Sequence, residues 1–175
     1  MGQTADDFTA ESDATLAALI AEHSASVYRL ARSVVRDPGL TDDVTQETFI
    51  KVWKNADEFR GEGSMRGWIL RIAYREAIAA LRRRRDAPTD PFTLAHPADP
   101  MTVGRVVEGR LAFESFAEAL DSLDETSRAI LVLREVEGLS YEEIAGTLEV
   151  PIPTVKSRLL RSRRSMAISL EGWRA

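Results

Sequence analysis

The chain has 175 residues, 44% of them hydrophobic, which allows one ordinary domain or two small domains with packed cores. It has no cysteine, which excludes disulfides and thiolate metal sites, and its two histidines, His23 and His96, are too far apart in sequence to indicate a metal site. It shows neither an apolar run of roughly 18 residues nor a signal peptide, so we expect a cytoplasmic protein without membrane insertion and without a metal or cofactor.

The net charge of −5 hides an uneven distribution along the chain. Residues 1–59 carry a net charge of −6 and residues 60–85 a net charge of +6. Residues 86–152 carry −10, and residues 153–175 carry +5. A phosphate responds to charges within a Debye length of about 8 Å, so the local blocks matter more than the total. Two basic blocks on an acidic body predict two separate contacts with DNA.

Helical periodicity dominates the N-terminal half. Residues 1–13 are predicted to be a disordered tail, and residues 14–35 repeat apolar side chains at helical spacing. A second helix is predicted over 42–55, and the three glycines of 59–67 indicate a loop. A third helix is predicted over 68–85, ending in four consecutive arginines.

The boundary between the first two helices has its own signals. Asp37-Pro38-Gly39 is predicted to end the first helix, and Thr41 to cap the second. The acidic residues that follow Thr41 would lie favourably in the first turn of that helix.

The C-terminal half is predicted to be helical after a linker. Prolines are frequent after residue 85, so residues 86–106 are predicted to form an extended, flexible linker. Helices resume near Val107 and continue over 125–137 and 139–166. No strand pattern or repeat interrupts them, which indicates an all-α fold of two small helical domains, at 14–85 and 107–175.

The segment Leu139–Met166 is predicted to be a helix-turn-helix. Val155, Leu159 and Met166 recur on one side of its second helix, and Pro153 suits the first turn. The remaining side chains are mostly cationic or polar, as in a helix that enters the major groove. A solvated amphipathic helix at the end of a bundle is the alternative.

Two further motifs lie in the first domain. The helix 42–55 carries an acidic, amide-bearing stripe, which is either a solvated face or a docking surface for a basic partner. The segment 59–75 interleaves aromatic residues with arginines, a combination that grips single-stranded nucleic acid. For Trp68 a place in the core is an equal alternative.

In this order the motifs resemble the sigma-70 superfamily of bacterial RNA polymerase sigma factors. The resemblance covers roughly residues 14–85 and 110–168, and it is carried by DDVTQETFIKVWK, FRGEGSMRGWILRIA and DSLDETSRAILVLREVEGLSYEEIAGTLEVPIPTVKSRLLRSRR. More narrowly, the chain resembles the extracytoplasmic-function (ECF) group, which keeps only regions 2 and 4. The spacing of both blocks is more specific than either block alone.

The resemblance implies three sets of functional residues. Region 2.2 would dock on the β′ coiled coil of core RNA polymerase through Asp42, Asp43, Gln46, Glu47 and Phe49. Regions 2.3 and 2.4 would melt and read the promoter −10 element through Phe59, Arg60, Ser64, Met65, Arg66, Trp68, Arg71, Arg75, Arg82 and Arg83. Region 4.2 would read the −35 element through Thr154, Lys156, Ser157, Arg158 and Arg161.

One part of the third helix departs from the family pattern. After Ile72-Ala73 the family commonly carries an Asn and, four residues later, an Asp. Here those places hold Arg75 and Ala79, so a polar pair that could orient the helix or contact DNA is missing.

The function implied is promoter recognition by a dissociable subunit that binds core RNA polymerase (its β′ and β subunits) and promoter DNA. The resemblance also implies control by an anti-sigma factor. A stand-alone helix-turn-helix regulator is the main alternative, although the acidic helix and the aromatic-arginine loop would then lack a role. An enzyme is disfavoured, because the chain has no cysteine, no paired histidines and no Walker-type or dinucleotide glycine pattern, and its carboxylates are scattered on helix faces.

Overall fold

A computed structural model describes residues 3–56, 59, 61, 63–86, 120 and 122–171. Within these ranges the chain is helical, which confirms the predicted all-α class. The linker after residue 86 and the helix predicted to begin near Val107 lie outside the described residues. The helices are α1 (Gln3–Val35), α2 (Pro38–Lys54), α3 (Met65–Asp86), α5 (Glu125–Glu135), α6 (Tyr141–Leu148) and α7 (Ile152–Glu171).

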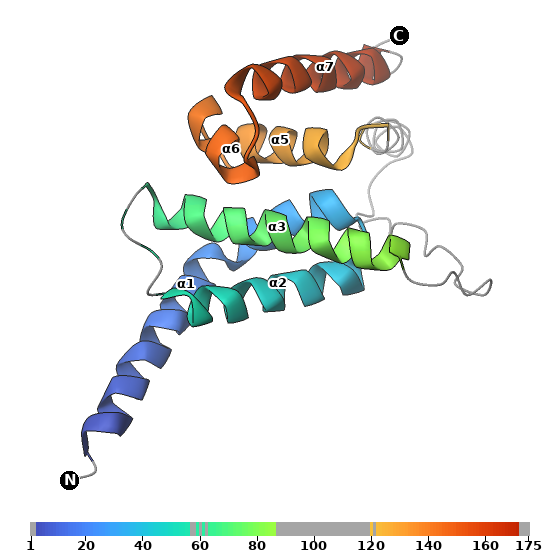
Figure 1. Cartoon of the computed structure of the whole chain (residues 1–175). Helices are drawn as coiled ribbons and strands as arrows, with labels where there is room; N and C mark the ends of the chain where they lie inside the picture. The colour runs from blue at the N-terminus through green and yellow to red at the C-terminus, as the bar shows by residue number, and fades with distance from the viewer. Residues whose placement is uncertain are drawn as a thin grey trace, which may run out of the picture.

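The helices form two units that pack directly on each other (Figure 1). The N-terminal unit consists of α1, α2 and α3, and the C-terminal unit of α5, α6 and α7. Helix α5 packs against α1, and α6 packs against α3, while α7 covers the outer side of α5 and α6. The N-terminal part of α1 extends beyond the other helices.

Three helices of the N-terminal unit start earlier than the sequence predicts. Helix α1 begins at Gln3, within the segment predicted to be a disordered tail, and no glycine or proline interrupts it before Val35. Helix α3 begins at Met65, so the last residues of the predicted loop form its first turn. Helix α2 begins at Pro38, where the missing N–H of proline loses no hydrogen bond within the helix.

The cap predicted for α2 is wrong. Asp37 is the N-cap, and its side chain accepts a hydrogen bond from the backbone N–H of Leu40 at 2.9 Å. Thr41 lies one turn inside the helix, fully buried, and its hydroxyl donates to the Asp37 carbonyl at 2.6 Å. Asp37 can cap because the extended backbone it needs is also the conformation that a following proline imposes.

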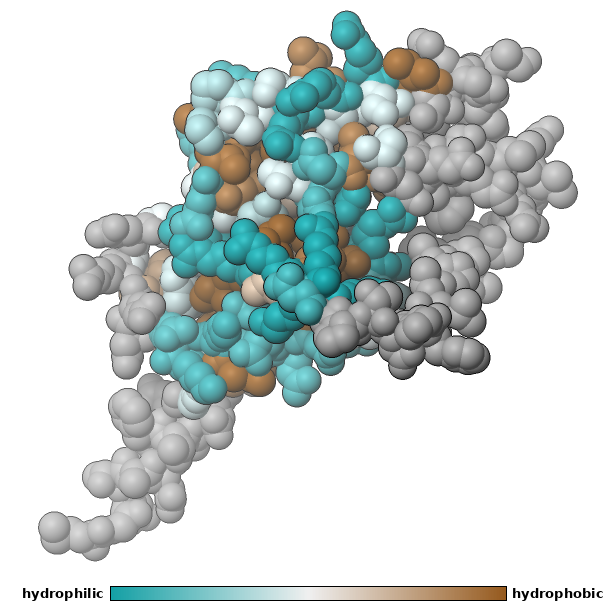
Figure 2. Space-filling view, turned by 45° about the vertical axis from the view of Figure 1, so that its right-hand side comes forward, coloured by the Kyte–Doolittle hydropathy of each residue, from teal (hydrophilic) through white to brown (hydrophobic). Residues whose placement is uncertain are grey.

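The apolar core is continuous across both units. Its fully buried members include Leu30 and Ile69 from the N-terminal unit and Ile130 and Ile144 from the C-terminal unit. Polar groups join the helices around it, as where Lys51 of α2 donates to the buried Glu76 of α3 at 2.6 Å. On the face drawn in Figure 2, hydrophilic side chains cover most of the described surface, with hydrophobic patches between them.

Local capping explains the helix-turn-helix. Ser140 and Glu143 form a reciprocal capping box at the start of α6. Glu149 ends α6 in the left-handed conformation, with φ 57°, which turns the chain into α7. Val155, Leu159 and Met166 are buried, as their spacing predicts.

Candidate nucleic-acid interface and docking groove

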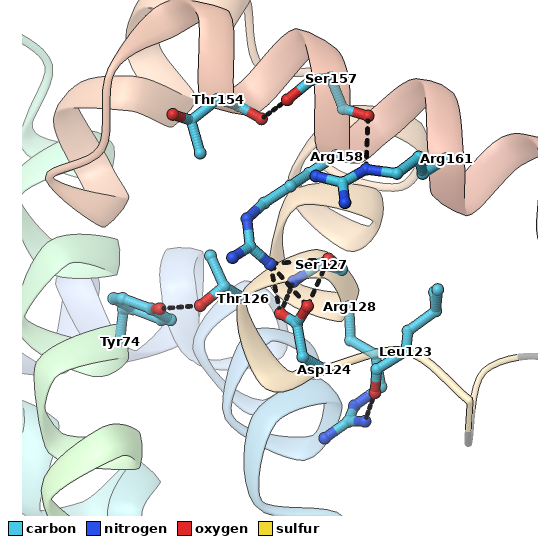
Figure 3. Close-up of polar contacts among 10 residues, drawn as sticks. All are labelled: Tyr74, Leu123, Asp124, Thr126, Ser127, Arg128, Thr154, Ser157, Arg158 and Arg161. Atoms are coloured by element: carbon cyan, nitrogen blue, oxygen red, sulfur yellow. Dashed lines mark hydrogen bonds and ion pairs between the residues drawn. The ribbon is translucent and has the colours of Figure 1, made fainter.

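Helix α7 presents a basic face whose side chains are largely exposed. Lys156, Ser157 and Arg161 are exposed, and Thr154 is half-buried. Contacts within the C-terminal unit orient this face: the Ser157 hydroxyl donates to the Thr154 carbonyl at 3.1 Å (Figure 3). The ammonium of Lys156 lies 5.6 Å from the ring centroid of Tyr141. Four of the five residues predicted to read DNA therefore share one accessible side.

Arg158 is the exception on α7. Its guanidinium turns inward and donates to both carboxylate oxygens of Asp124, at 2.7 and 2.6 Å, and to the Ser127 hydroxyl at 3.1 Å (Figure 3). Asp124 is the N-cap of α5 and accepts from the Ser127 N–H at 2.9 Å. Arg158 thus fixes α7 against the start of α5 instead of extending to a base edge.

The electrostatics of Asp124 agree with this structural role. Burial, which opposes its ionisation, is the largest single effect on its pKa. Hydrogen bonds from Ser127 and Arg158 together outweigh burial and lower the pKa. The carboxylate is therefore held ionised, opposite the Arg158 guanidinium.

Sequence reasoning missed two exposed residues on the same side of α7. Leu160 is 66% exposed between the cationic residues, and Arg164 is also exposed. Helical spacing gives the signal: Leu160 follows Lys156 by four residues, and Arg164 follows Leu160 by four.

The arginines of α3 are placed differently from those of α7. Arg66 contacts Glu137, and Arg75 forms an ion pair with Glu149, both acids lying in the C-terminal unit. The Arg75 Nε donates to the Glu149 carboxylate at 3.1 Å. Arg71 lies half-buried against α6, where a Cβ added to Gly146 would be 3.7 Å from its guanidinium. These three predicted DNA contacts therefore face the second unit of the same chain.

Glu137 is the centre of the contact between the two units. Its side chain is 1% exposed, and its carboxylate accepts from Ser26 Oγ at 2.7 Å and from Arg29 Nε at 2.6 Å. Arg66 donates to the same carboxylate and, at 3.1 Å, to the Glu137 backbone carbonyl. Burial alone would raise the pKa of Glu137, but hydrogen bonds from Arg29, Ser26 and Arg66 outweigh it and lower the pKa.

The other residues predicted to bind the −10 element are spread along α3 and its preceding loop. Phe59 and Trp68 pack on each other, with ring centroids 5.6 Å apart, and both are half-buried. Ser64 is exposed and accepts from the Gly67 N–H, whereas Met65 packs against the core. Arg60 lies outside the described residues. Arg82 and Arg83 are exposed at the far end of α3.

An open apolar groove of about 450 Å³ runs between α1 and α2. Three of the residues predicted to dock polymerase line it or edge it, namely Asp42, Gln46 and Phe49. Asp43 is exposed and Glu47 half-buried nearby on α2. Most of the apolar lining was not among the predicted docking residues, and Trp53, which belongs to it, is 38% exposed. That lining comprises Leu16, Ile20, Phe49, Ile50 and Trp53.

The described part of the chain shows neither a cluster that could hold a metal ion nor a helix that could span a membrane. No group of three or more His, Asp or Glu side chains is placed there to hold a metal ion. Among the helices described, none has an apolar stretch long enough to cross a bilayer.

Fold and surfaces together define a two-part helical DNA-binding protein. The sigma-70 region 2 family model matches residues 19–87, and the sigma-70 region 4 model matches residues 113–166. Both matches agree with the order of the two units in the structure.

Relatives and solved structures agree with the two models. The ECF RNA polymerase sigma factor SigE of Mycolicibacterium smegmatis is 36% identical over 152 residues, covering 85% of this chain but 58% of the relative. The RNA polymerase sigma-H factor of Pseudomonas aeruginosa is 31% identical, covering 87% of this chain and 84% of the relative.

Two solved complexes share the fold. The sigma factor RpoE in complex with the anti-sigma factor NepR from Bartonella quintana has a TM-score of 0.70 at 24% identity, covering 94% of this chain and 97% of that one. CnrH in complex with the cytosolic domain of CnrY has a TM-score of 0.66 at 26% identity, covering 91% and 90%. The chain belongs to the ECF group of the sigma-70 family of RNA polymerase sigma factors.

Proposed function

We propose that this chain binds core RNA polymerase through the α1–α2 groove and directs it to promoters that α3 and α7 recognise. One observation carries the proposal: a single chain presents an apolar groove edged by Asp42 and Gln46 and, on a separate unit, a recognition helix with an exposed basic face. A stand-alone regulator would use the helix alone. A polymerase subunit uses both surfaces, and family membership supports that reading.

The groove fits an amphipathic helix with basic flanks. Ile20, Ile50 and Trp53 are each 38% exposed, so a partner would remove apolar surface from water. Asp42 and Gln46 stand at the edge of the groove, where carboxylate and amide groups would fix the register of a cationic partner. We assign this surface to the β′ coiled coil.

The −35 assignment changes in two residues. Thr154, Lys156, Ser157 and Arg161 remain the proposed readers, since they share the accessible side of α7. Leu160 joins them, because an apolar side chain among donors suits the methyl group of thymine. Arg158 leaves the set, since Asp124 and Ser127 hold its guanidinium.

The −10 assignment requires the two units to separate. Positions −35 and −10 are about 25 base pairs apart, or about 85 Å of duplex at about 3.4 Å per pair. A compact chain of this length has a radius of gyration of about 16 Å. The packed arrangement in Figure 1 is too small to reach both elements at once. Separation would also uncover Arg66, Arg71 and Arg75.

The same proposal implies where the chain acts and what kind of protein would regulate it. A polymerase subunit acts where the polymerase and the chromosome are, which places this chain in the cytoplasm and gives it a binding role without a cofactor. An anti-sigma factor that covers the groove or the DNA-binding faces would keep the chain inactive. The Bartonella quintana RpoE shares this fold and was solved with such a partner.

Run-off transcription with purified core polymerase on a randomised promoter library tests the proposal. We expect transcripts only when the chain is added, from templates enriched in two separated motifs. Tight duplex binding without polymerase, together with no stimulation of transcription, would identify a stand-alone regulator instead.

A pair of matched variants tests the groove. We expect Ile50→Asn to weaken binding to core polymerase about fivefold to tenfold, because it removes part of a buried apolar contact. Tyr28→Asn is the control, since Tyr28 is equally exposed on α1 but does not line the groove. The affinity is measured by titrating labelled chain with core enzyme. Equal losses in both variants would rule out the groove as the docking surface.

A further inference from the structure

Two residues of α3 bear on which base of the −10 element the chain reads. Arg75 and Ala79 stand where the family commonly carries an asparagine and an aspartate. We propose that Arg75 reads a guanine of the −10 element through its guanidinium, at a position where an asparagine would favour adenine. This inference rests on the −10 role proposed above for Arg75 and names the base that the residue recognises.

Arg75 lies between two other arginines on one side of α3. Arg71 precedes it by four residues and Arg82 follows it by seven, which is the spacing of one helix face. The side chain of Arg75 is 57% exposed, and Arg82 is exposed as well. Contacts with phosphates position a protein on DNA, whereas contacts with base edges specify the sequence. In this row, the outer arginines can hold the backbone while the middle one reaches a base edge.

The residues one turn from Arg75 on α3 carry no negative charge. They are Arg71, Ile72, Ile78 and Ala79. The adjacent acid, Glu76, is buried and accepts from the Lys51 ammonium at 2.6 Å. An aspartate at position 79 would follow Arg75 by four residues, the spacing at which opposite charges pair along a helix. The two departures from the family pattern therefore act together, because Ala79 leaves the new guanidinium available to a partner outside its own helix.

The contact with Glu149 shows the donor fork that Arg75 presents. Its Nε donates to one carboxylate oxygen at 3.1 Å, and one of its terminal nitrogens donates to the other oxygen. Guanine offers a similar pair of acceptors, O6 and N7, on its major-groove edge, and arginine on guanine is the commonest specific contact in that groove. An asparagine amide offers one donor and one acceptor, which match N7 and N6 of adenine. The exchange of asparagine for arginine thus changes the base that fits this position.

The edge of guanine that carries O6 and N7 is accessible in both states of the −10 element. It faces the major groove while the base pair is intact, and it is uncovered when the base is unpaired. Arg75 can therefore read guanine before or after the strands separate. A bidentate contact of this kind distinguishes the right base from a wrong one by about tenfold or more.

Transcription from a promoter library tests the assignment. The −35 motif selected by the wild type is kept, the −10 region is randomised, and each template is identified by a transcribed barcode. We expect one −10 position at which guanine gives about tenfold more transcript than adenine. In Arg75→Gln the preference should move to adenine at that position, because a glutamine amide matches adenine. A guanine preference that persists in this variant, or that is absent from the wild type, would overturn the proposal.

Arg82→Gln is the matched control, since it makes the same substitution on the same side of α3. We expect it to lower transcription from all templates alike and to leave the preferred base unchanged, because loss of a phosphate contact weakens binding without changing sequence preference. If Arg82→Gln moved the preference as Arg75→Gln does, the preference would reflect the charge of α3, and the proposal would be wrong.

A modified base separates a base contact from a phosphate contact. 7-Deazaguanine keeps the Watson–Crick edge of guanine but lacks the N7 acceptor. Placed at the selected position, it should lower transcription by the wild type about fivefold and leave transcription by Arg75→Gln unaffected. Equal effects on the two proteins would mean that Arg75 contacts only the backbone, which contradicts the proposal.

Substitutions at position 79 test whether the two departures are coupled. In Ala79→Asp the new carboxylate should pair with Arg75 along α3 and reduce the guanine-over-adenine ratio about twofold. Ala79→Asn adds a side chain of nearly the same size without the charge, and we expect it to leave the ratio unchanged. Equal reductions would mean that crowding, and not pairing, affects Arg75, and the coupling would be refuted.

The proposed function and this inference fail in different ways. Absence of transcription from every template would refute the proposed function and the guanine contact with it. Transcription whose −10 preference does not depend on Arg75 would refute the guanine contact alone.

Discussion

Two helices of this sigma factor carry the same kind of residue and use it differently. The arginines of α3 and the cationic residues of α7 both read as DNA contacts from the sequence. In the structure, Arg66 and Arg75 of α3 pair with carboxylates of the other unit, whereas Lys156 and Arg161 of α7 are exposed. An arginine's role is set by the acid within about 4 Å of it, not by its place on a polar helix face.

The difference also divides α7 itself. Arg158 and Arg161 are one turn apart, yet Arg158 is bound to the N-cap of α5 while Arg161 remains accessible. Removing each guanidinium in turn is the sharpest test of this comparison. The two substitutions should affect different measurements.

The largest effect is expected for Arg161→Ala. Loss of an exposed guanidinium at a base edge or phosphate should weaken binding to a −35 duplex by about 1–3 kcal/mol. Arg163→Ala is the matched control, because it removes the same charge from α7 at a residue that pairs with Glu135. A competition assay with −35 duplexes at fixed salt measures both. Equal weakening of duplex binding by the two variants would mean that α7 binds DNA through its net charge and does not read the base sequence.

A smaller effect, on stability, is expected for Arg158→Ala. The ion pair with Asp124 is partly exposed, with side-chain exposures of 30% and 51%, so its removal should cost about 1 kcal/mol in the free energy of unfolding. Urea unfolding monitored by circular dichroism measures this. The −35 sequences selected from a promoter library should not change. A changed −35 preference at unaltered stability would restore Arg158 as a base reader.

The sequence was sufficient for features that depend on local spacing. The apolar repeat of Val155, Leu159 and Met166 predicted the buried side of α7, and Pro153 marked its first turn. The N-cap of α2 was misplaced by one turn, since Asp37 and Thr41 are both good capping residues and only the backbone distinguishes them.

Contacts between the units could not be predicted in the same way. Glu137 meets Ser26 and Arg29 across 111 and 108 residues of chain, and Arg75 meets Glu149 across 74. Helical periodicity says which side of a helix is polar, but not which distant helix lies opposite. The apolar groove was not predicted for a related reason. Its lining combines side chains of α1 and α2, and the sequence does not show that these two helix faces meet.

The smallest effect is expected from pH near neutrality. The pKa values of Glu137 and Glu149 are both lowered in the folded chain, the first because its three hydrogen bonds outweigh burial, the second mainly by its hydrogen bond with Arg75. A lowered folded pKa gives stability that is complete above the unfolded value, about 4.3 for glutamate, and that is lost as pH falls through the folded value.

The contact between the units should therefore not act as a pH switch in the cell. We expect the difference in unfolding free energy between wild type and Glu137→Gln/Glu149→Gln to stay constant from about pH 8 to about pH 5, and to shrink below about pH 4. Urea titrations across that range measure the difference, in which groups common to both proteins cancel. A difference that already falls between about pH 7 and about pH 6 would show that these carboxylates are not held ionised by the α1 and α3 side chains, and the contrast between α3 and α7 would lose its electrostatic basis.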